Sequence, residues 1–304
     1  MITLRGLTKR YGEKTVVDGL TCAVAPGSVT GFLGPNGSGK STTMRMTVGL
    51  DRPTAGSVLV NGKPYAELKH PLREVGALLE AKALHPGRSA GRHLLAMARS
   101  NGIPASRVEE VLATVGLTDV AGKRAGQFSL GMGQRLGIAG ALLGDPGVLM
   151  FDEPVNGLDP DGVRWVRQLM RSLAEEGRTV FVSSHLMSEM QLTADHLVVI
   201  GKGKLLADAP VDEFIAGNSL SSVSVRVPTP VERDTLARHL LTRGAAVEPG
   251  EADELVVTGA GVGEVGDLAH ELGVRLHGLG ERTASLEQAY MELTASSVEY
   301  GVTA

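Results

Sequence analysis

The sequence has one cysteine, no long apolar run and no excess of basic residues, and each absence excludes a class of protein. The single cysteine, Cys22, rules out an intrachain disulfide and a cysteine-based metal site, and it fits a reducing compartment. The longest apolar runs, such as Leu136–Leu143, fall far short of the ~18 residues needed to span a bilayer. The first residues contain no apolar signal-peptide core, so we expect no signal peptide. Any membrane role is therefore expected to depend on a partner.

The charge balance is mildly acidic, with a formal net charge of −4 over 304 residues. Nucleic-acid-binding domains usually carry a basic excess, so we expect no nucleic-acid partner. Hydrophobic residues make up 42% of the chain and charged residues 21%, which is ordinary for a globular protein. The length predicts about two domains.

The most informative stretch satisfies the pattern G-x-x-x-x-G-K-[ST] of a phosphate-binding loop. A buried strand at Ser28–Leu33 precedes this stretch, and a helix over Ser41–Leu50 is expected to follow it. Strand, loop and helix N-terminus together place backbone N–H groups around phosphate charge, which favours a triphosphate site over a simple turn in a glycine-rich chain. Lys40 is expected to bridge β- and γ-phosphate oxygens. The predicted binding residues are Gly34, Pro35, Asn36, Gly37, Ser38, Gly39, Lys40, Ser41 and Thr42.

A second apolar strand, Val148–Phe151, ends in Asp152 and Glu153. Ligands of open α/β sheets bind at the carboxyl ends of strands, so both carboxylates are expected near the phosphate loop. Mg²⁺ is expected to be held by the Ser41 hydroxyl and, through water, by Asp152. Glu153 would then polarise the attacking water as a general base. The alternative is a pair of solvated acids at the start of the Pro154–Pro160 loop.

Three further residues fit the same chemistry. His185 follows the apolar strand Thr179–Ser184, so its imidazole is expected at the same sheet edge as Asp152, where it can hydrogen-bond the γ-phosphate or the attacking water. A helix cap or a surface position is the alternative for this histidine. Ser129 and Gly131, at a helix start, can offer a hydroxyl and backbone N–H groups to an anion. Taken alone, these two residues fit an N-cap and a turn equally well.

The remaining pattern predicts an α/β fold for the first two thirds of the chain. Alternating apolar residues at Ile2–Leu7 and Val16–Val24 predict antiparallel strands. Short unbroken apolar strands predict a parallel sheet covered on both faces. The region from Pro86 to Gly126 shows helical spacing.

A composition shift near Gly217 predicts a boundary between domains 1–217 and 218–304. The order β-α-β-β-α-β that follows is typical of a small ferredoxin-like α+β domain, with its last strand at Val274–Leu279. A final helix is expected to begin at Ser285, which opens a capping-box pattern.

In this order, the motifs resemble those of the ATP-binding subunits of ABC transporters. Tyr11 resembles the aromatic A-loop residue that stacks on adenine, although alone it would be read as a turn tyrosine. Phe128–Met132 aligns with the Leu-Ser-Gly-Gly-Gln signature, and Gln134 and Arg135 follow it. The other matches are Gly34–Ser41 with Walker A, Val148–Glu153 with Walker B and its catalytic glutamate, Gly157–Asp159 with the D-loop, and His185 with the switch histidine.

The resemblance implies a P-loop NTPase fold of the ABC type, with a parallel RecA-like sheet, an antiparallel β subdomain and a helical subdomain. The C-terminal domain would be an accessory domain for regulation or dimerisation. ATP and Mg²⁺ would be the ligands of a head-to-tail homodimer. Each ATP would lie between Lys40, Asp152, Glu153 and His185 of one copy and Ser129 and Gly131 of the other. The dimer would drive a separately encoded membrane permease from the cytoplasmic face of the cell membrane.

Two departures from the family pattern point to a subgroup. The signature has Leu130 and Met132 where the family has glycine and glutamine, and Glu80 stands at the position of the Q-loop glutamine. A carboxylate can ligate Mg²⁺ but cannot donate a hydrogen bond as an amide does, so Glu80 is a candidate metal ligand. These variations, and the segment Ser285–Thr294, resemble bacterial exporters of drugs, antibiotics and lantibiotics.

Two other classes of function stay open at this point. A soluble ABC ATPase that acts on DNA or ribosomes would carry long coiled-coil insertions or a second nucleotide domain, and the chain shows neither pattern. A nucleotide-dependent regulator without turnover would fit the altered signature, but Glu153 and His185 favour hydrolysis.

Overall fold

The computed structural model describes residues 1–80, 84–218, 222–250, 253–282 and 285–294. The chain forms two compact units, whose main segments are Met1–Val211 and Asp212–Leu293. The domain boundary predicted between residues 217 and 218 falls at the end of helix α8, and Ser219 lies outside the described residues. That this boundary separates a nucleotide-binding domain from an accessory domain stays a prediction.

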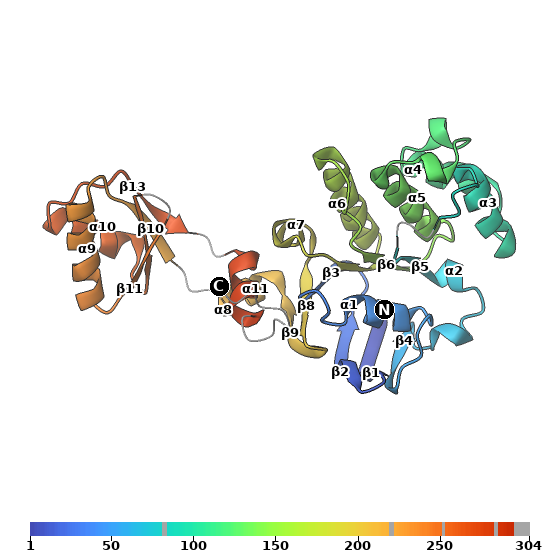
Figure 1. Cartoon of the computed structure of the whole chain (residues 1–304), viewed down its shortest axis with the longest axis horizontal. Helices are drawn as coiled ribbons and strands as arrows, with labels where there is room; N and C mark the ends of the chain where they lie inside the picture. Colours follow the sequence, from blue (N-terminus) through green and yellow to red (C-terminus); the bar gives the residue numbers. More distant parts are fainter. Residues whose placement is uncertain (81–83, 219–221, 251–252, 283–284, 295–304) are drawn as a thin grey trace. The chain divides into compact units, whose positions relative to one another are not determined.

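The first unit is built on a six-stranded sheet with the strand order β5-β6-β7-β3-β8-β9 (Figure 1). All neighbouring strands in it are parallel except β8 and β9, which form an antiparallel hairpin. Phe32 and Phe181 pack in its core with ring centroids 4.9 Å apart. The strands are β3 (Ser28–Leu33), β5 (Val75–Leu78), β6 (Val148–Asp152), β7 (Thr179–Ser183), β8 (His196–Gly201) and β9 (Lys204–Pro210).

A second, antiparallel sheet has the order β2-β1-β4. Its strands are β1 (Ile2–Tyr11), β2 (Lys14–Val24) and β4 (Ala55–Val60). Its buried residues, such as Leu20, share one apolar core with Phe32 of the large sheet and Met44 of α1. The antiparallel strands predicted at the start of the chain are therefore confirmed, and both are longer than expected.

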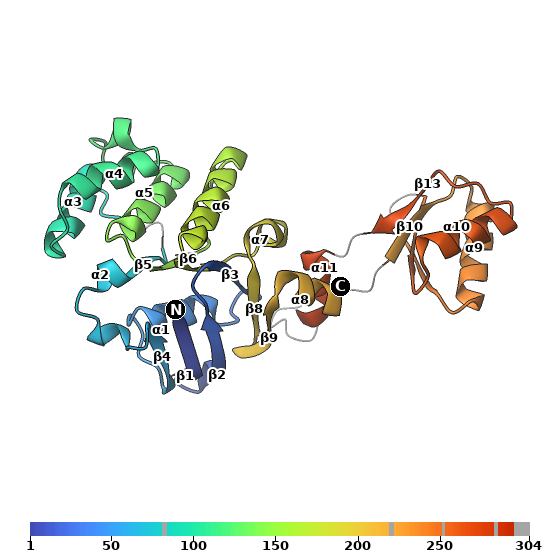
Figure 2. The same cartoon turned by 180° about the vertical axis from the view of Figure 1, so that it is seen from behind.

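Helices cover the large sheet and form a separate cluster. In Figures 1 and 2, α6 and α1 lie on opposite sides of the sheet, while α3, α4 and α5 group together. Of these helices, α3 and α4 fall within the region from Pro86 to Gly126 that was predicted to be helical. Among the described residues, no helix has both the length and the apolar character that a bilayer span requires. The α-helices are α1 (Lys40–Thr47), α2 (Pro71–Glu74), α3 (Ala90–Ser100), α4 (Ser106–Thr114), α5 (Leu130–Leu142), α6 (Pro160–Glu175) and α7 (Met187–Thr193), and the 3₁₀ turns are Tyr65–Glu67, Thr118–Val120 and Ala125–Gln127.

The helix after the phosphate loop is shorter than predicted. It was expected to reach Leu50, but α1 ends at Thr47. Gly49 adopts φ 71°, a left-handed conformation that ends a helix at little cost only for glycine. Leu50 is left 60% exposed beyond the helix.

The second unit contains a four-stranded antiparallel sheet with the order β11-β12-β10-β13. This order, with one helix after the first strand and another after the third, confirms the ferredoxin-like prediction. Ser285 accepts a hydrogen bond from the Gln288 N–H at 3.2 Å, so the final helix begins where predicted. The elements are α8 (Val211–Asn218), β10 (Ser222–Arg226), α9 (Pro230–Thr242), β11 (Ala246–Pro249), β12 (Glu254–Thr258), α10 (Val262–Glu271), β13 (Gly278–Arg282) and α11 (Leu286–Thr294).

The last strand of this sheet was predicted at Val274–Leu279, and that position is wrong. Gly273 ends α10 with φ 66°, and the Val274 N–H donates back to the Ala269 carbonyl at 2.9 Å. Val274 therefore closes the helix as a buried cap residue instead of opening the strand. The strand that pairs with β10 is β13, Gly278–Arg282.

Candidate functional site

The phosphate loop connects β3 to α1 and can be built only with glycine at two places. A Cβ on Gly34 would lie 2.5 Å from the Ile200 carbonyl oxygen. A Cβ on Gly39 would lie 2.7 Å from the Val16 carbonyl oxygen, and Gly39 has φ 106°. At these two positions the backbone of the loop therefore approaches its neighbours too closely for a side chain.

Two polar side chains of the loop are buried. Lys40 is 8% exposed, and its Nζ donates to the carbonyls of Gly34 at 2.6 Å and Pro35 at 3.2 Å. Burial lowers the pKa of Lys40, while the charges of Glu153 and Asp152 act in the opposite direction. The Ser38 hydroxyl is buried and has no hydrogen-bond partner among the described residues. A buried, unsatisfied hydroxyl beside a buried ammonium group fits an anionic ligand.

Most of the predicted nucleotide residues line one cavity of about 220 Å³. Its lining comprises residues 36–42 of the loop with Val16, Asp152 and Glu153. Gly34 and Pro35 lie behind the lining and contribute the carbonyls that hold Lys40. The structure thus brings the loop and both acidic residues of β6 together, as the sheet topology predicts.

The acidic residues are held by the neighbouring strand β7. Asp152 Oδ1 accepts a hydrogen bond from the Ser183 hydroxyl. The Glu153 N–H donates to the Ser183 carbonyl at 3.2 Å and to the Ser183 Oγ at 3.1 Å. His185 lies just beyond this strand, and its Nδ1 is 2.7 Å from Glu153 Oε2. The carboxylate of Glu153 therefore lies between the cavity and the imidazole.

The backbone of Glu153 is strained. Its φ is 51°, a region that a non-glycine residue occupies at a cost of about 1–3 kcal/mol and only when its surroundings hold it there. The buried side chain of Gln134 helps to hold Glu153 in this conformation, since its Nε2 donates to the Glu153 carbonyl at 3.0 Å. The sequence did not predict a role for Gln134, because the contact joins residues 19 apart in the chain and no sequence pattern indicates it.

Tyr11 lies at the end of β1 and is 49% exposed. Its hydroxyl donates to Asp51 Oδ2 at 3.2 Å and interacts with the Thr42 side chain of the phosphate loop. Lys9 Nζ lies 4.8 Å from the ring centroid. Partial burial and the charge of Asp51 raise the pKa of the Tyr11 phenol. An exposed ring next to the loop can accept a stacked base, although the ring does not line the cavity itself.

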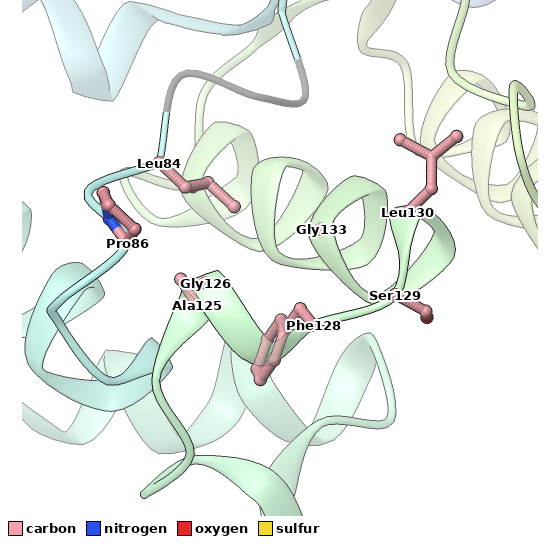
Figure 3. Close-up of a pocket in the computed structure, with 8 residues that line it drawn as sticks. All are labelled: Leu84, Pro86, Ala125, Gly126, Phe128, Ser129, Leu130 and Gly133. Atoms are coloured by element: carbon pink, nitrogen blue, oxygen red, sulfur yellow. The ribbon is translucent and has the colours of Figure 1, made fainter.

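Ser129 and Gly131 lie outside the cavity lining, at the exposed first turn of α5. The Ser129 Oγ accepts the Met132 N–H at 3.2 Å and so caps the helix. Leu130, between them, is 50% exposed, and Figure 3 shows its side chain pointing away from that of Ser129. A Cβ on Gly131 would lie 3.2 Å from the Gly157 carbonyl oxygen, so this turn packs directly on the D-loop segment.

Glu80 also lies outside the Lys40 cavity. It lines a groove of about 430 Å³ between β5, α3 and α5, together with Arg45 and His93. The His93 Nδ1 in that groove is buried and has no hydrogen-bond partner among the described residues, and burial lowers the pKa of His93. The metal-binding role of Glu80 stays a prediction.

Comparisons with known proteins agree with this geometry. A family model described as "ABC transporter" matches residues 17–156, and one described as "Domain of unknown function (DUF8746)" matches residues 221–287. An uncharacterized ABC transporter ATP-binding protein, YhcH of Bacillus subtilis (strain 168), is 37% identical over 303 residues, which cover 98% of this chain and 97% of the relative. The bacitracin transport ATP-binding protein BcrA of Bacillus licheniformis is 44% identical over 217 residues, covering 70% of this chain and 71% of the relative.

A solved structure gives the same result for the fold. The dimeric structure of a post-hydrolysis state of the ATP-binding cassette MJ0796, bound to ADP and Pi, superposes with a TM-score of 0.63 at 25% identity. The superposition covers 69% of this chain and 98% of that one. That structure is a nucleotide-bound dimer of a protein with this fold.

Proposed function

The chain belongs to the family of ABC transporter ATP-binding proteins, and from this premise we propose that it hydrolyses ATP to power an exporter through a separate membrane subunit. The observation that carries the proposal is the shared cavity of the phosphate loop, Asp152 and Glu153, with His185 hydrogen-bonded to Glu153 behind it. In this site Lys40 binds β- and γ-phosphate oxygens. Glu153 orients the attacking water and takes its proton, and His185 holds the carboxylate.

The residues of this cavity fit a magnesium ion. The Ser41 hydroxyl and the Asp152 carboxylate are hard oxygen donors that face the same space. The described residues contain no cluster of three acidic, histidine or cysteine side chains that would hold a metal by themselves. This agrees with Mg²⁺, which keeps several waters and shares ligation with substrate phosphates. When bound, the ion neutralises charge that develops on the phosphates.

Ser129 and Gly131 complete the site on a second copy of the chain. They lie outside the cavity of their own copy, at the exposed N-terminus of α5, a 13-residue helix whose dipole favours an anion. A head-to-tail pair would place this turn over the γ-phosphate held by the other copy's Lys40. Support comes from the dimeric, nucleotide-bound cassette of the same fold.

The groove lined by Glu80 is the proposed docking surface for the membrane subunit, in a peripheral position at the cytoplasmic face of the membrane. Its wall is largely apolar, with Leu50, Leu72 and Met97 beside the charged Arg45. Residues 81–83, which follow Glu80 in the chain, lie outside the described residues. The name of the bacitracin transport relative supports an antibiotic-type cargo for the exporter.

The hydrolysis proposal is tested with Glu153→Gln. This variant should lower ATP turnover about 100-fold or more, because the general base is lost, while ATP affinity stays within a factor of about three. Phosphate release and equilibrium ATP binding are measured on the purified chain. Glu175→Gln, an exposed substitution at the end of α6, is the matched control and should change neither quantity. Full turnover in Glu153→Gln would contradict the assignment of the base.

The docking proposal is tested with Leu50→Glu, because Leu50 is exposed in the groove and its replacement leaves the core intact. The chain is co-expressed with the membrane subunit that it is proposed to drive, and the recovery of the chain in the membrane fraction is measured. We expect Leu50→Glu to reduce that recovery about tenfold while the ATPase activity of the isolated chain is unchanged. Leu241→Glu, an equally exposed position of α9, should behave like the unaltered chain.

A further inference from the structure

The backbone of Glu153 is held from two sides by different parts of the first unit. Its N–H is bound by Ser183, the last residue of β7. Its carbonyl accepts a hydrogen bond from Gln134 Nε2, which belongs to α5. Since φ of Glu153 is 51°, the residue depends on such contacts to keep its position. Strand β7 supplies one of these contacts, and helix α5 supplies the other.

Gln134 is placed so that this contact is specific. The side chain is 3% exposed, and its Nε2 lies 3.0 Å from the Glu153 carbonyl oxygen. Because the amide of Gln134 is buried, water cannot easily take the place of this hydrogen bond. Removal of the amide would therefore leave the Glu153 carbonyl without this donor. The neighbouring residue Arg135 turns away and donates to the Val115 carbonyl at 3.0 Å.

The same helix contacts the other end of the loop that follows Glu153. A Cβ on Gly157 would lie 2.2 Å from Leu130 Cδ2, so Leu130 covers this glycine closely. Leu130 is the first residue of α5, and Gln134 follows about one turn later on the same helix. The first turns of α5 therefore contact both ends of the segment 153–157, and a displacement of the helix must displace the segment or break these contacts.

We propose that Gln134 is a positioning residue that sets the carboxylate of Glu153 for water activation and links it to the N-terminus of α5. This inference rests on the proposed function, because it requires Glu153 to be the base. The exposed turn Ser129–Gly131 would bind the nucleotide held by the partner copy, while Gln134 on the same helix holds the base of its own copy. One helix thereby connects the two nucleotide sites of the pair.

The test compares Gln134→Leu with the unaltered chain. The leucine is similar in size and lacks the donor, so the carbonyl of Glu153 loses its contact with α5. We expect kcat for ATP hydrolysis to fall between about 10- and 100-fold, while KM for ATP changes less than about twofold. Should Gln134→Leu fail to fold, Gln134→Met keeps the unbranched shape and takes its place. An unchanged kcat in the folded variant would overturn the proposal.

A control separates positioning from general destabilisation. Ile138→Val alters a residue of the same helix that is 1% exposed, so it loosens the packing of α5 without removing the contact to Glu153. We expect this variant to keep its kcat. A loss of kcat in Ile138→Val equal to that in Gln134→Leu, at matched thermal stability, would show that Gln134 acts only through the fold.

A double variant distinguishes failure of this inference from failure of the proposed function. In the Glu153→Gln background, Gln134→Leu should lower the residual single-turnover rate less than about twofold, because the base that it positions is already gone. An undiminished effect of Gln134→Leu in this background would overturn the inference. Full turnover in Glu153→Gln alone would instead overturn the assignment of the base, whatever Gln134→Leu does.

Discussion

The phosphate loop and the first turn of α5 both present helix N-termini, but they are built in opposite ways. At α1 the N-cap is Gly39, no side chain caps the helix, and the neighbouring Ser38 and Lys40 are buried. At α5 the Ser129 hydroxyl caps the helix, and Leu130 is 50% exposed. The first N-terminus therefore opens onto a cavity of its own chain, while the second is exposed, where we propose that the nucleotide of a second copy supplies the anion.

The largest expected effect tests the phosphate loop and its cavity, the inward-facing half of the proposed nucleotide site; the start of α5 is its outward-facing half. Lys40→Met removes a buried ammonium group that would contact two phosphates, and each such contact to a charged group contributes about 1.5–3 kcal/mol. ATP affinity should therefore fall about 1000-fold. Equilibrium binding of a fluorescent ATP analogue measures it, and Lys123→Met, an exposed substitution, is the control. Retained affinity in Lys40→Met would remove the loop from the nucleotide site.

The next effect tests the outward-facing half without disturbing its helix. Aspartate is as good an N-cap as serine, so Ser129→Asp should fold normally. Its negative charge would stand where the partner's γ-phosphate binds, and ATP-dependent pairing of the chain should weaken about 100-fold. Analytical ultracentrifugation of the Glu153→Gln background with and without MgATP measures the pairing.

Ser89→Asp is the matched control for that change. Ser89 caps α3 by accepting the Arg92 N–H at 3.4 Å, and it makes the same kind of contact as Ser129 on a helix that lies outside the proposed interface. Pairing should persist in Ser89→Asp. Equal pairing of the Ser129→Asp and Ser89→Asp chains would show that the start of α5 does not meet the nucleotide.

A smaller effect concerns Tyr11, which lies beside the inward-facing half and is largely exposed. Tyr11→Ala removes a ring whose stacking on a base is worth about 1–3 kcal/mol, so the Kd for ATP should rise about tenfold. Tyr11→Phe keeps the ring and removes the hydroxyl that contacts Asp51 and Thr42, and it should bind ATP like the unaltered chain. A Kd that rises equally in both variants would assign the effect to the contacts of the hydroxyl instead of stacking.

The smallest effect concerns Glu80, which the structure places outside the Lys40 cavity. If its carboxylate joins the magnesium site when the nucleotide binds, Glu80→Gln should raise the Mg²⁺ concentration for half-maximal hydrolysis about threefold. Glu67→Gln, in the turn after β4, is the control. An unchanged magnesium dependence would assign Glu80 to the groove alone.

The sequence predicted most of the inward-facing half because its parts are local. Strand β3 has the predicted limits, Ser28–Leu33, and Asp152 and Glu153 reach the loop through the order of a parallel sheet. Limits set by single glycines were harder to predict. Gly49 ends α1 before the predicted limit, and Gly273 ends α10 so that Val274 caps the helix instead of opening a strand. Each of these limits depends on one backbone angle and not on periodicity.

Contacts between distant residues could not be predicted in the same way. The hydrogen bond from Gln134 to Glu153 joins a helix to a loop across the fold. Leu130 stands where the family has glycine, and only the structure shows that its side chain packs on Gly157. Both contacts involve helix α5. The sequence therefore predicted the residues of the cavity better than the contacts that join the cavity to α5.

Mixing two inactive variants tests the composite site most directly. Lys40→Met lacks the inward-facing half, and Ser129→Asp lacks the outward-facing half, so pairs of either variant contain no complete site. A mixed pair contains one complete site, formed by Lys40 of one copy and Ser129 of the other. Mixed before ATP is added, the two variants should hydrolyse ATP faster than the sum of their separate rates. A rate equal to that sum would contradict a site shared between two copies.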